Sequence, residues 1–388
     1  MSAVEAAFRE HRGPLLATLV AELRSFDLAE DALQDAFAAA TRQWPGEGVP
    51  QRPAAWLLSV ARRRAVDRRR RDETLLRYLP RLITPEARES DIDPEADDSL
   101  PLLFACCHPA LALEARVALT LRFVAGLTVP EIARLFLVSE PTMAARITRS
   151  KQKIRAAGIP LGVPSPHDLP VRAEGVAAVL YLLFTEGYRS HRHELAAEAI
   201  RICRLMPPAP ETTALLALML LQHSRRHARL SDGQIVLLPD QDRSRWNGRE
   251  IAEALALLDT PAPVGPYRLQ ARIAAQHAIA RRAADTDWRA IAELYARLED
   301  LTGSPVVRLN RAVAVAEAEG PAAALDLLDV DLPGNHHLPA ARAEMLLRLG
   351  RTAAAAEQFD IALALAPTDT ERDHLRRRRE SAPGTGTG

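Results

Sequence analysis

Apolar residues recur three and four positions apart along most of the chain, and this spacing constrains the fold more than any other feature of the sequence. Side chains at these intervals share one face of an α-helix, so each such stretch predicts a helix with one buried side. Strand signals are scarce, because alanine, leucine, arginine and glutamate dominate the composition and aromatic residues make up only 4%. The sequence therefore predicts an all-α protein.

Breaks rich in proline and glycine divide this helical pattern. At 388 residues the chain exceeds what one compact core usually holds. Residues 80–98 are acidic, contain three prolines and lack apolar periodicity, so they cannot bury enough surface to offset the entropy of ordering. We expect a small helical domain, an acidic linker, a helix-turn-helix domain and a helical repeat-like extension, at residues 1–79, 80–99, 100–160 and 166–380.

The charges cancel overall but are sorted along the chain. Fifty basic residues match fifty acidic ones, so no global field attracts the protein to nucleic acid or to a membrane. Residues 62–71 nevertheless hold seven arginines and one acid, whereas residues 86–98 hold seven acids and one arginine. Any attraction to a polyanion must therefore be local.

Several classes of protein lack support in the sequence. The cysteines Cys106, Cys107 and Cys203 offer neither a disulfide framework nor the paired spacing of a structural zinc site. The start MSAVEAAFREHR is unlike a secretory signal, and nowhere do eighteen apolar residues run unbroken. Phosphate loops, nucleophile elbows and recognisable acid/base pairs are missing. We expect a cytoplasmic protein without a membrane span, metal or cofactor, which is not an enzyme.

A helix-turn-helix pattern runs through residues 117–155. Gly126 fits the turn after a helix ending near Val124, Thr128 can cap the next helix, and Ser139 can cap a third. That third helix carries the residues that we expect to meet DNA, namely Ser139, Glu140, Thr142, Ala145, Arg146, Arg149, Lys151 and Lys153. Arginine can bind guanine edges in the major groove, and the other cations can neutralise phosphates. The alternative is an ordinary solvated helix in a three-helix bundle.

A second basic element lies about fifty residues upstream. Pro53 can start a helix that we expect to reach about Asp72, after a loop from Trp44. The early turns of this helix are apolar, so the arginines at 62–71 would be presented rigidly, as suits binding to a DNA backbone. The alternative is a charged helix face or a nonspecific basic tract.

The region after residue 165 is rich in alanine and contains a short self-similarity. The segments beginning at Ala312 and Ala343 each place a glycine, Gly320 or Gly350, between two helical stretches. This arrangement resembles tetratricopeptide units, in which small residues let paired helices stack closely. Residues 229–247 interrupt the region as a nonhelical insert, which is either a plain loop or a contact surface.

These motifs together carry a family resemblance. The segments EDALQDAFAAATRQW at 30–44 and RPAAWLLSVARRRAVDRRRR at 52–71, with the helix-turn-helix, resemble a bacterial sigma factor. The chain is most similar to the extracytoplasmic-function group of the sigma-70 family. From Asp97 onward it resembles a subgroup with a tetratricopeptide-like C-terminal extension. The resemblance implies that core RNA polymerase, through its large-subunit clamp helices and flap, and promoter DNA are the partners.

The resemblance also assigns roles to residues. Those implied to bind polymerase are Asp27, Glu30, Asp31, Gln34, Asp35 and Phe37. Those implied to melt and hold the −10 element are Trp44, Arg52, Trp56, Arg62, Arg63, Arg64, Arg68, Arg70 and Arg71. Arg146 and Arg149 match the helix that reads the −35 element. The chain departs from the family pattern at Arg63, Pro141 and Ala144, so the promoter sequence cannot be carried over.

The resulting hypothesis is a sigma factor that directs core polymerase to specific promoters. Its acidic linker would follow the basic RNA exit path of the polymerase and be displaced by the growing transcript. One alternative is a conventional helix-turn-helix regulator with a helical-repeat sensing domain, and another is a scaffold built on the repeats. The sequence leaves open an anti-sigma partner and whether the extension inhibits or is required for activity.

Overall fold

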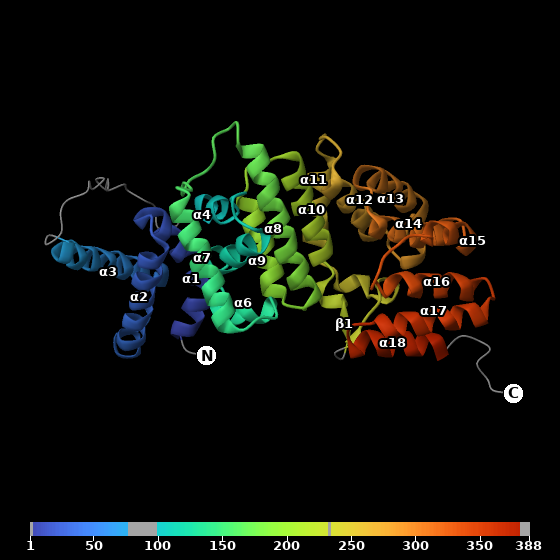
Figure 1. Cartoon of the computed structure of the whole chain (residues 1–388), viewed down its shortest axis with the longest axis horizontal. Coiled ribbons are helices and arrows are strands. Elements are labelled where there is room, and N and C mark those ends of the chain that lie inside the picture. The colour runs from blue at the N-terminus through green and yellow to red at the C-terminus, as the bar shows by residue number, and fades with distance from the viewer. Residues whose placement is uncertain (1–2, 77–98, 232–233, 381–388) are drawn as a thin grey trace. The chain divides into compact units, whose positions relative to one another are not determined.

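A computed structural model gives the structure of the protein and describes residues 3–76, 99–231 and 234–380. Regular structure in these residues is almost entirely helical, as Figure 1 shows. The exception is one antiparallel pair of short strands, β1 (Leu230–Ser231) and β2 (Gln234–Ile235). The all-α prediction is confirmed.

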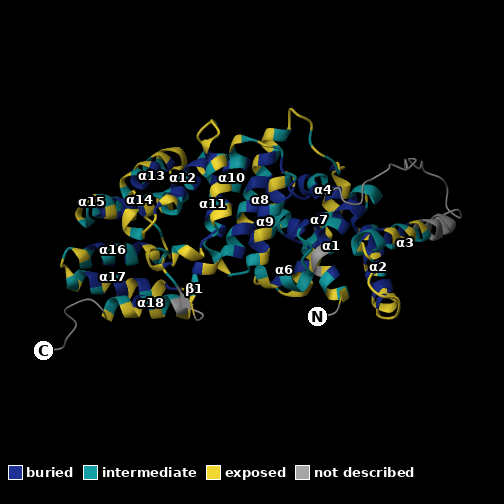
Figure 2. Ribbon diagram, turned by 180° about the vertical axis from the view of Figure 1, so that it is seen from behind, coloured by how far each residue is buried: buried dark blue, intermediate teal, exposed yellow. Residues whose placement is uncertain are grey.

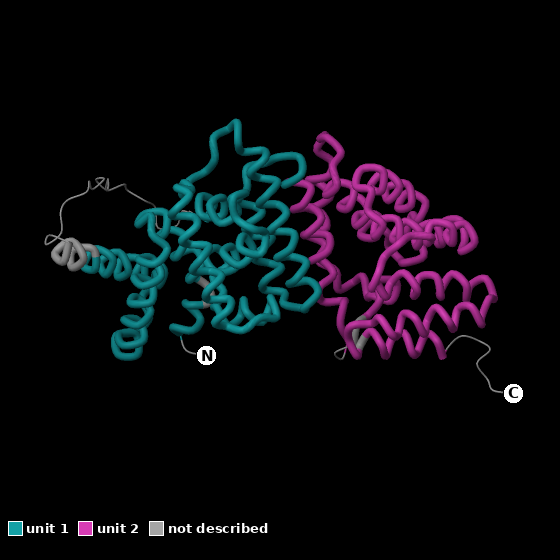
Figure 3. Tube along the Cα trace, in the orientation of Figure 1, with its two compact units in different colours: residues 1–212 teal, residues 213–388 magenta. Residues whose placement is uncertain are grey.

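The chain forms two compact units, residues 1–212 and residues 213–388, which Figure 3 shows in different colours. Each unit is described by itself below. The predicted domains were defined by their expected functions, whereas the two units are defined by how the chain packs. The two units therefore do not test the predicted domain boundaries, which stay a prediction. The predicted acidic linker at 80–99 lies outside the described residues apart from Ser99.

The first three helices of unit 1 form an N-terminal module: α1 (Ala3–Leu23), α2 (Phe26–Glu47) and α3 (Pro53–Leu76). Ser25 caps α2 by accepting a hydrogen bond from the Leu28 backbone N–H. The loop expected from Trp44 begins later, because α2 continues to Glu47 through Pro45. A proline in the last turn removes only its own N–H donor, and Gly48, at φ 85°, then closes the helix on the Trp44 carbonyl.

The helix-turn-helix module follows in unit 1 as α4 (Ser99–Cys106), α5 (Leu113–Leu119), the π-helical turn η1 (Thr120–Val124), α6 (Val129–Leu135) and α7 (Glu140–Ala156). Both predicted caps are confirmed. Thr128 and Glu131 form a reciprocal capping box at the start of α6, and the Ser139 hydroxyl accepts from the Thr142 N–H at the start of α7. Gly126 occupies the expected turn at φ 72°.

Two further helices complete unit 1, namely α8 (Leu169–Arg189) and α9 (His193–Leu205). Helix α8 packs against α4 and α5, and α9 also contacts α4. The Arg172 guanidinium donates to the Phe104 carbonyl at 2.5 Å. On α8, Val176, Leu180 and Leu183 are buried. Figure 2 colours the helices by burial, with buried segments in dark blue. The first helices of the predicted extension therefore help to form the core beneath the helix-turn-helix.

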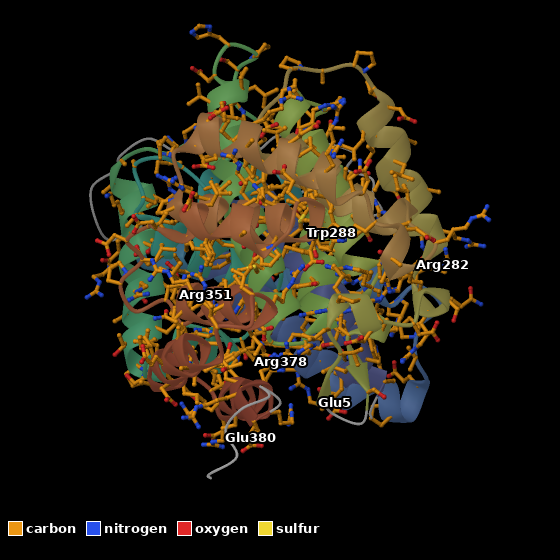
Figure 4. All side chains as sticks on the ribbon, turned by 90° about the vertical axis from the view of Figure 1, so that its right-hand side faces the viewer. Glu5, Arg282, Trp288, Arg351, Arg378 and Glu380 are labelled. Carbon is orange, nitrogen blue, oxygen red and sulfur yellow. The ribbon has the colours of Figure 1, made fainter. Side chains whose placement is uncertain are left out.

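The remaining helices pack largely on their neighbours in sequence, as in the pairs α12 with α13, α13 with α14, and α16 with α17. Gly320 and Gly350 take positive φ at the turns before α15 and α17. Arg378 of α18, which is labelled in Figure 4, donates hydrogen bonds to the Glu344 carboxylate of α16 at 2.7 and 2.5 Å. The helices are α10 (Pro210–His223), which starts in unit 1, α11 (Gly248–Asp259), α12 (Pro266–Ile279), α13 (Trp288–Thr302), α14 (Pro305–Ala318), α15 (Pro321–Leu325), α16 (His337–Arg348), α17 (Thr352–Leu365) and α18 (Asp369–Glu380).

In the insert, the described residues 229–231 and 234–247 are nonhelical apart from two short 3-10 turns, η3 (Leu238–Asp240) and η4 (Arg243–Arg245), and they include both strands. Arg243 donates to the Ala280 carbonyl at 3.0 Å and lies over the Trp246 ring at 4.5 Å. It thereby satisfies a carbonyl just beyond the C-terminal end of α12. This part of the insert is a packed structural segment.

Candidate nucleic-acid interface

Helix α7 presents most of the residues predicted to meet DNA on its outward side. Its apolar side is buried at Met143, Ile147 and Ile154, which fixes how the helix is rotated. Arg146 lies half-buried with its guanidinium over the Phe136 ring at 5.5 Å. The residues of the predicted set that are exposed are Ser139, Glu140, Thr142, Ala145, Arg149 and Lys153.

Lys151 differs from the other predicted DNA contacts on α7. Its side chain is only 14% exposed, and its ammonium donates to Glu30 of α2 at 3.3 Å and to Asp27 at 2.5 Å. Both carboxylates belong to the set predicted to bind polymerase. The structure therefore brings together two sets of residues to which the sequence assigned different partners.

Helix α3 carries the second predicted basic surface. Arg52, Arg63 and Arg64 are exposed, and Trp56 is half-buried. Two other arginines are held within the N-terminal module: Arg62 by Glu22 of α1 at 3.1 and 2.5 Å, and Arg68 by Asp31 of α2 at 3.0 Å. The hydrogen bond with Glu22 raises the pKa of Arg62. Arg70 and Arg71 belong to α3, but their side chains lie outside the described residues.

Two aromatic residues predicted as contacts are buried instead of exposed. Trp44 is 5% exposed and meets the Trp56 ring edge-on at a centroid distance of 5.6 Å. Phe37 is 7% exposed and meets the Phe8 ring in the same manner at 5.0 Å. Such pairs add packing energy within the module. In this arrangement both side chains support the surface of the module from inside.

The acidic side of α2 is largely paired with cations. Asp31 forms an ion pair with Arg68, as described above. Glu30 forms ion pairs with Lys151 and with Arg122 of η1. The Arg122 Nε donates to Glu30 Oε1 at 2.8 Å. Asp27 accepts from Lys151 and, at 3.1 Å, from Arg155 of α7. Hydrogen bonding by Lys151 is the main cause that lowers the pKa of Asp27. Of the rest of the predicted set, Gln34 is exposed and Asp35 is half-buried.

We refer to Asp27 and Glu30 together with Arg122, Lys151 and Arg155 as the inter-module clasp. No local pattern in the sequence indicates the roles of Arg122 and Arg155, because their partners lie about a hundred residues away in the chain. Lys151 did carry a signal, since it lies four residues after Ile147 and three before Ile154. That spacing places it beside the buried face of α7.

Close backbone packing accompanies the clasp. A Cβ atom on Gly13 of α1 would lie 2.6 Å from the Val124 carbonyl oxygen, and one on Gly126 would lie 3.0 Å from the Gly13 nitrogen. The buried Arg12 side chain donates to the carbonyls of Gly126 and Leu127, and burial lowers its pKa to about 10. Only glycine permits this approach without displacement of the backbone.

An aromatic pair adds to this packing. Phe26 of α2 meets Phe123 of η1 edge-on at a centroid distance of 4.6 Å. Both rings are buried. The two modules therefore share an apolar and hydrogen-bonded contact as well as ion pairs.

A groove of about 860 Å³ opens within unit 1. Helix α2 lines it with Gln34, Phe37, Ala38 and Thr41, and α9 lines it with Leu195 and Glu198. Glu131 and the Thr128 cap of α6 also reach it. One stretch of the predicted polymerase-binding face is thus bordered by a helix of the predicted extension.

The three cysteines considered at sequence level, Cys106, Cys107 and Cys203, are all buried. Burial raises the pKa of Cys107 to about 11 and that of Cys106 well above its usual value, so both are neutral thiols at pH 7. His223 of α10 is 7% exposed, and its Nδ1 lies 3.0 Å from Glu250 Oε1. Over the described ranges, no three His, Cys, Asp or Glu side chains are grouped so that they could hold a metal ion.

No helix among the described residues combines the length and the apolar character needed to cross a membrane.

Three family models match the chain: Sigma-70 region 2 at residues 7–74, Sigma-70, region 4 at residues 102–154, and a family of unknown function, DUF6596, at residues 172–262. An uncharacterized protein of Rhizobium meliloti (strain 1021) is 43% identical over 398 residues, covering 96% of this chain and 94% of that protein.

No solved structure matches the chain. The two sigma-70 matches cover the N-terminal module and the helix-turn-helix module, which are the parts that hold the predicted polymerase and DNA contacts. Members of this family are transcription initiation factors and not enzymes. The chain belongs to the sigma-70 family of RNA polymerase sigma factors, which recognise promoters.

Proposed function

We propose that this sigma factor works as an extracytoplasmic-function member of its family, in the cytoplasm, with two DNA contacts. Helix α7 reads the −35 element in the major groove, and the loop before α3 together with α3 melts and holds the −10 element. The observation that carries this assignment is the outward row of α7, where Arg149 and Lys153 are exposed behind the Ser139 cap. A capped helix with a rigid basic face suits direct readout.

On the N-terminal module, the acidic side of α2 is the proposed contact for the polymerase clamp helices. Asp27, Asp31 and Gln34 are exposed, and their oxygen atoms suit a basic partner helix. Because Phe37 and Trp44 are buried, we assign them a supporting role under the exposed residues. The exposed Arg63 and Arg64 are the proposed backbone contacts for the opened strand.

For the extension we propose a tetratricopeptide-like architecture that stabilises and regulates the factor. Support comes from the helix pairs of unit 2 with glycine at the turns before α15 and α17, and from the packing of α8 on the helix-turn-helix module. We also propose that the acidic linker follows the basic RNA exit path of the polymerase and is displaced by the growing transcript. This part of the proposal rests on the linker sequence alone. An anti-sigma partner is left open.

Reconstitution with core RNA polymerase tests the proposal. We expect the full-length protein to direct transcription from defined start sites, mapped genome-wide by sequencing transcript 5′ ends. Asp35→Arg should weaken binding to core polymerase, whereas the charge reversal Asp300→Arg, at an exposed position on α13, should not. Start sites that are unaffected by the added protein, with intact DNA binding, would favour a conventional helix-turn-helix regulator.

A further inference from the structure

One of the predicted DNA contacts on α7, Arg146, is held by an aromatic ring of the preceding helix. Its guanidinium lies 5.5 Å from the centroid of the Phe136 ring, and both side chains are half-buried. A guanidinium is attracted to the face of an aromatic ring and stacks on it with its own plane. The contact therefore limits the directions in which Arg146 can point.

The ring itself projects from a fixed turn between α6 and α7. Phe136 follows the last residue of α6, and its backbone N–H donates to the Ile132 carbonyl at 3.0 Å. Leu137 then takes a left-handed conformation at φ 51°, and the Val138 N–H donates to the Ala133 carbonyl at 3.0 Å. The backbone on both sides of the turn is thus hydrogen-bonded, and the ring meets α7 at a defined place.

Stacking leaves the polar edge of the Arg146 guanidinium available. The five N–H donors of arginine lie in the plane of the group, so a ring against its face blocks none of them. With the residues that the structure describes, this guanidinium forms the ring contact but no ion pair or hydrogen bond. An oriented cation with unused donors suits an anionic acceptor outside the chain.

The rotation of α7 decides which part of the DNA supplies that acceptor. With about 100° per residue, Arg146 lies about 70° from the middle of the four buried positions of α7, Arg149 about 130° and Ala145 about 170°. A helix with its side chains is about 10–12 Å wide and the major groove about 12 Å, so the side of the helix opposite its buried face meets base edges, and its flanks meet the phosphate backbones. Arg146 therefore faces the wall of the groove.

We propose that Phe136 is a positioning residue that holds Arg146 as a phosphate contact at the wall of the −35 major groove. Arg149, which lies closer to the base edges, then carries the base recognition. Fixing the guanidinium before DNA arrives reduces the conformational entropy that a long side chain loses on binding. The inference rests on the proposed function, because it takes α7 as the helix in the −35 groove, and it separates two arginines to which the resemblance assigns one role.

Removal of the charge tests the assignment of Arg146 to the backbone. Arg146→Met retains an apolar stem over the ring. In the holoenzyme reconstituted with core polymerase, this variant should bind about tenfold more weakly to every duplex in a set with altered −35 base pairs. The slope of log affinity against log salt should fall by about one. A changed preference at any base pair would show that Arg146 reads a base, and would overturn the assignment.

A double-mutant cycle tests the role of Phe136. Phe136→Leu removes the ring but keeps an apolar side chain, and it should weaken promoter binding about threefold. Phe136→Tyr, which keeps the ring, should bind as the wild type does. In the Arg146→Met background Phe136→Leu should cause no further loss, whereas in the matched Arg149→Ala background it should cause the full threefold loss.

The outcomes separate a positioning role from a structural one. A loss that persists when Arg146 is already absent, or a loss in Phe136→Tyr equal to that in Phe136→Leu, would show that Phe136 acts through the fold of the turn. Either result would overturn the positioning role. If neither Arg146→Met nor Arg149→Ala changes promoter affinity, the proposed function of α7 fails. If Arg149→Ala weakens binding but the losses from Phe136→Leu and Arg146→Met simply add, the role of Phe136 fails alone.

Discussion

The two basic helices of unit 1, α3 and α7, differ in where the carboxylate partners of their cations lie. Arg62 and Arg68 of α3 pair with Glu22 and Asp31, which belong to the same three-helix module. On α7, by contrast, Lys151 pairs across to the carboxylates of another module. Pairs within a module persist when modules separate, whereas pairs between modules are lost. The cations of α3 therefore stabilise the N-terminal module itself. The cations on the inner side of α7 stabilise the contact between the two modules.

The largest expected effect comes from the backbone contact that lets α7 reach α2. Gly13→Ala would place a Cβ atom 2.6 Å from the Val124 carbonyl, a backbone group that cannot rotate away. We expect the modules to separate at a cost of about 3 kcal/mol. The melting temperature should fall by several degrees, while hydrogen exchange in α3 stays slow.

Gly46→Ala is the control for that variant, because nothing lies within 4 Å of the corresponding Cβ position. It should leave the melting temperature nearly unchanged or slightly higher. If the amide protons of α3 exchange faster in Gly13→Ala than in Gly46→Ala, the two basic helices are not independent and the comparison fails.

The outward side of α7 gives the next effect. Arg149→Ala should cost about 1–3 kcal/mol of promoter binding by the holoenzyme and relax selectivity at one base pair of the −35 element. Lys153→Ala should weaken binding to all sequences alike and reduce the slope of log affinity against log salt by about one. Binding assays over a salt series on duplexes with altered −35 sequences separate the two outcomes. Equal behaviour of both variants would remove the distinction between a base contact and a phosphate contact.

The local features of α7 could be predicted because they depend on neighbours in the sequence. Thr128 and Ser139 cap the helices they precede, and the apolar spacing fixed which side is buried. Two residues whose roles come from the family resemblance, Phe37 and Trp44, lie on an apolar side of α2 and are buried. Phe37 and Trp44 are seven residues apart on α2, so the helical period places them on one buried side. The clasp itself depends on contacts between distant segments, which no local pattern encodes.

Helices α3 and α7 also differ in the backbone conformation just before they begin. This difference predicts a smaller effect on the free energy of unfolding. Helix α3 begins at Pro53, whose fixed φ suits a first turn, whereas α7 follows Leu137, which has φ 51° and is 92% exposed. A left-handed conformation costs a residue other than glycine about 1–2 kcal/mol. Leu137→Gly should therefore raise the free energy of unfolding by about 0.5–1 kcal/mol in urea titrations. A decrease would show that the exposed leucine side chain packs in a way that offsets its backbone strain.

Pairs within the N-terminal module should matter less. The side chains of Arg62 and Glu22 are 38% and 15% exposed, and those of Arg68 and Asp31 are 43% and 51% exposed. Arg62→Ala should cost about 0.5 kcal/mol of stability, and Arg68→Ala close to nothing, because exposed pairs are strongly screened. Neither should change the rate of hydrogen exchange in α7. A change in that rate would mean that α3 and the clasp are coupled.

The smallest expected effect is the response of the clasp to pH. Lys151 and Arg155 face Asp27 and lower its pKa from the usual value of 3.8. A carboxyl whose pKa is lower in the closed state than in the open state favours closure at pH above its usual value. This contribution disappears as pH falls through the lowered value. Between pH 7 and 5 the clasp should therefore stay closed. Below about pH 4 it should weaken by only about 0.2–0.4 kcal/mol, because Asp27 is 55% exposed.

Energy transfer between dyes on α3 and α7 measures this opening directly. Asp27→Asn serves as the comparison, because it removes the titrating group while keeping the shape of the side chain. The wild-type protein should show a larger loss of transfer than this variant between pH 5 and pH 3. Equal losses in the two proteins would mean that opening at low pH arises from other carboxylates, and that Asp27 contributes to the clasp only through contacts that do not depend on its charge.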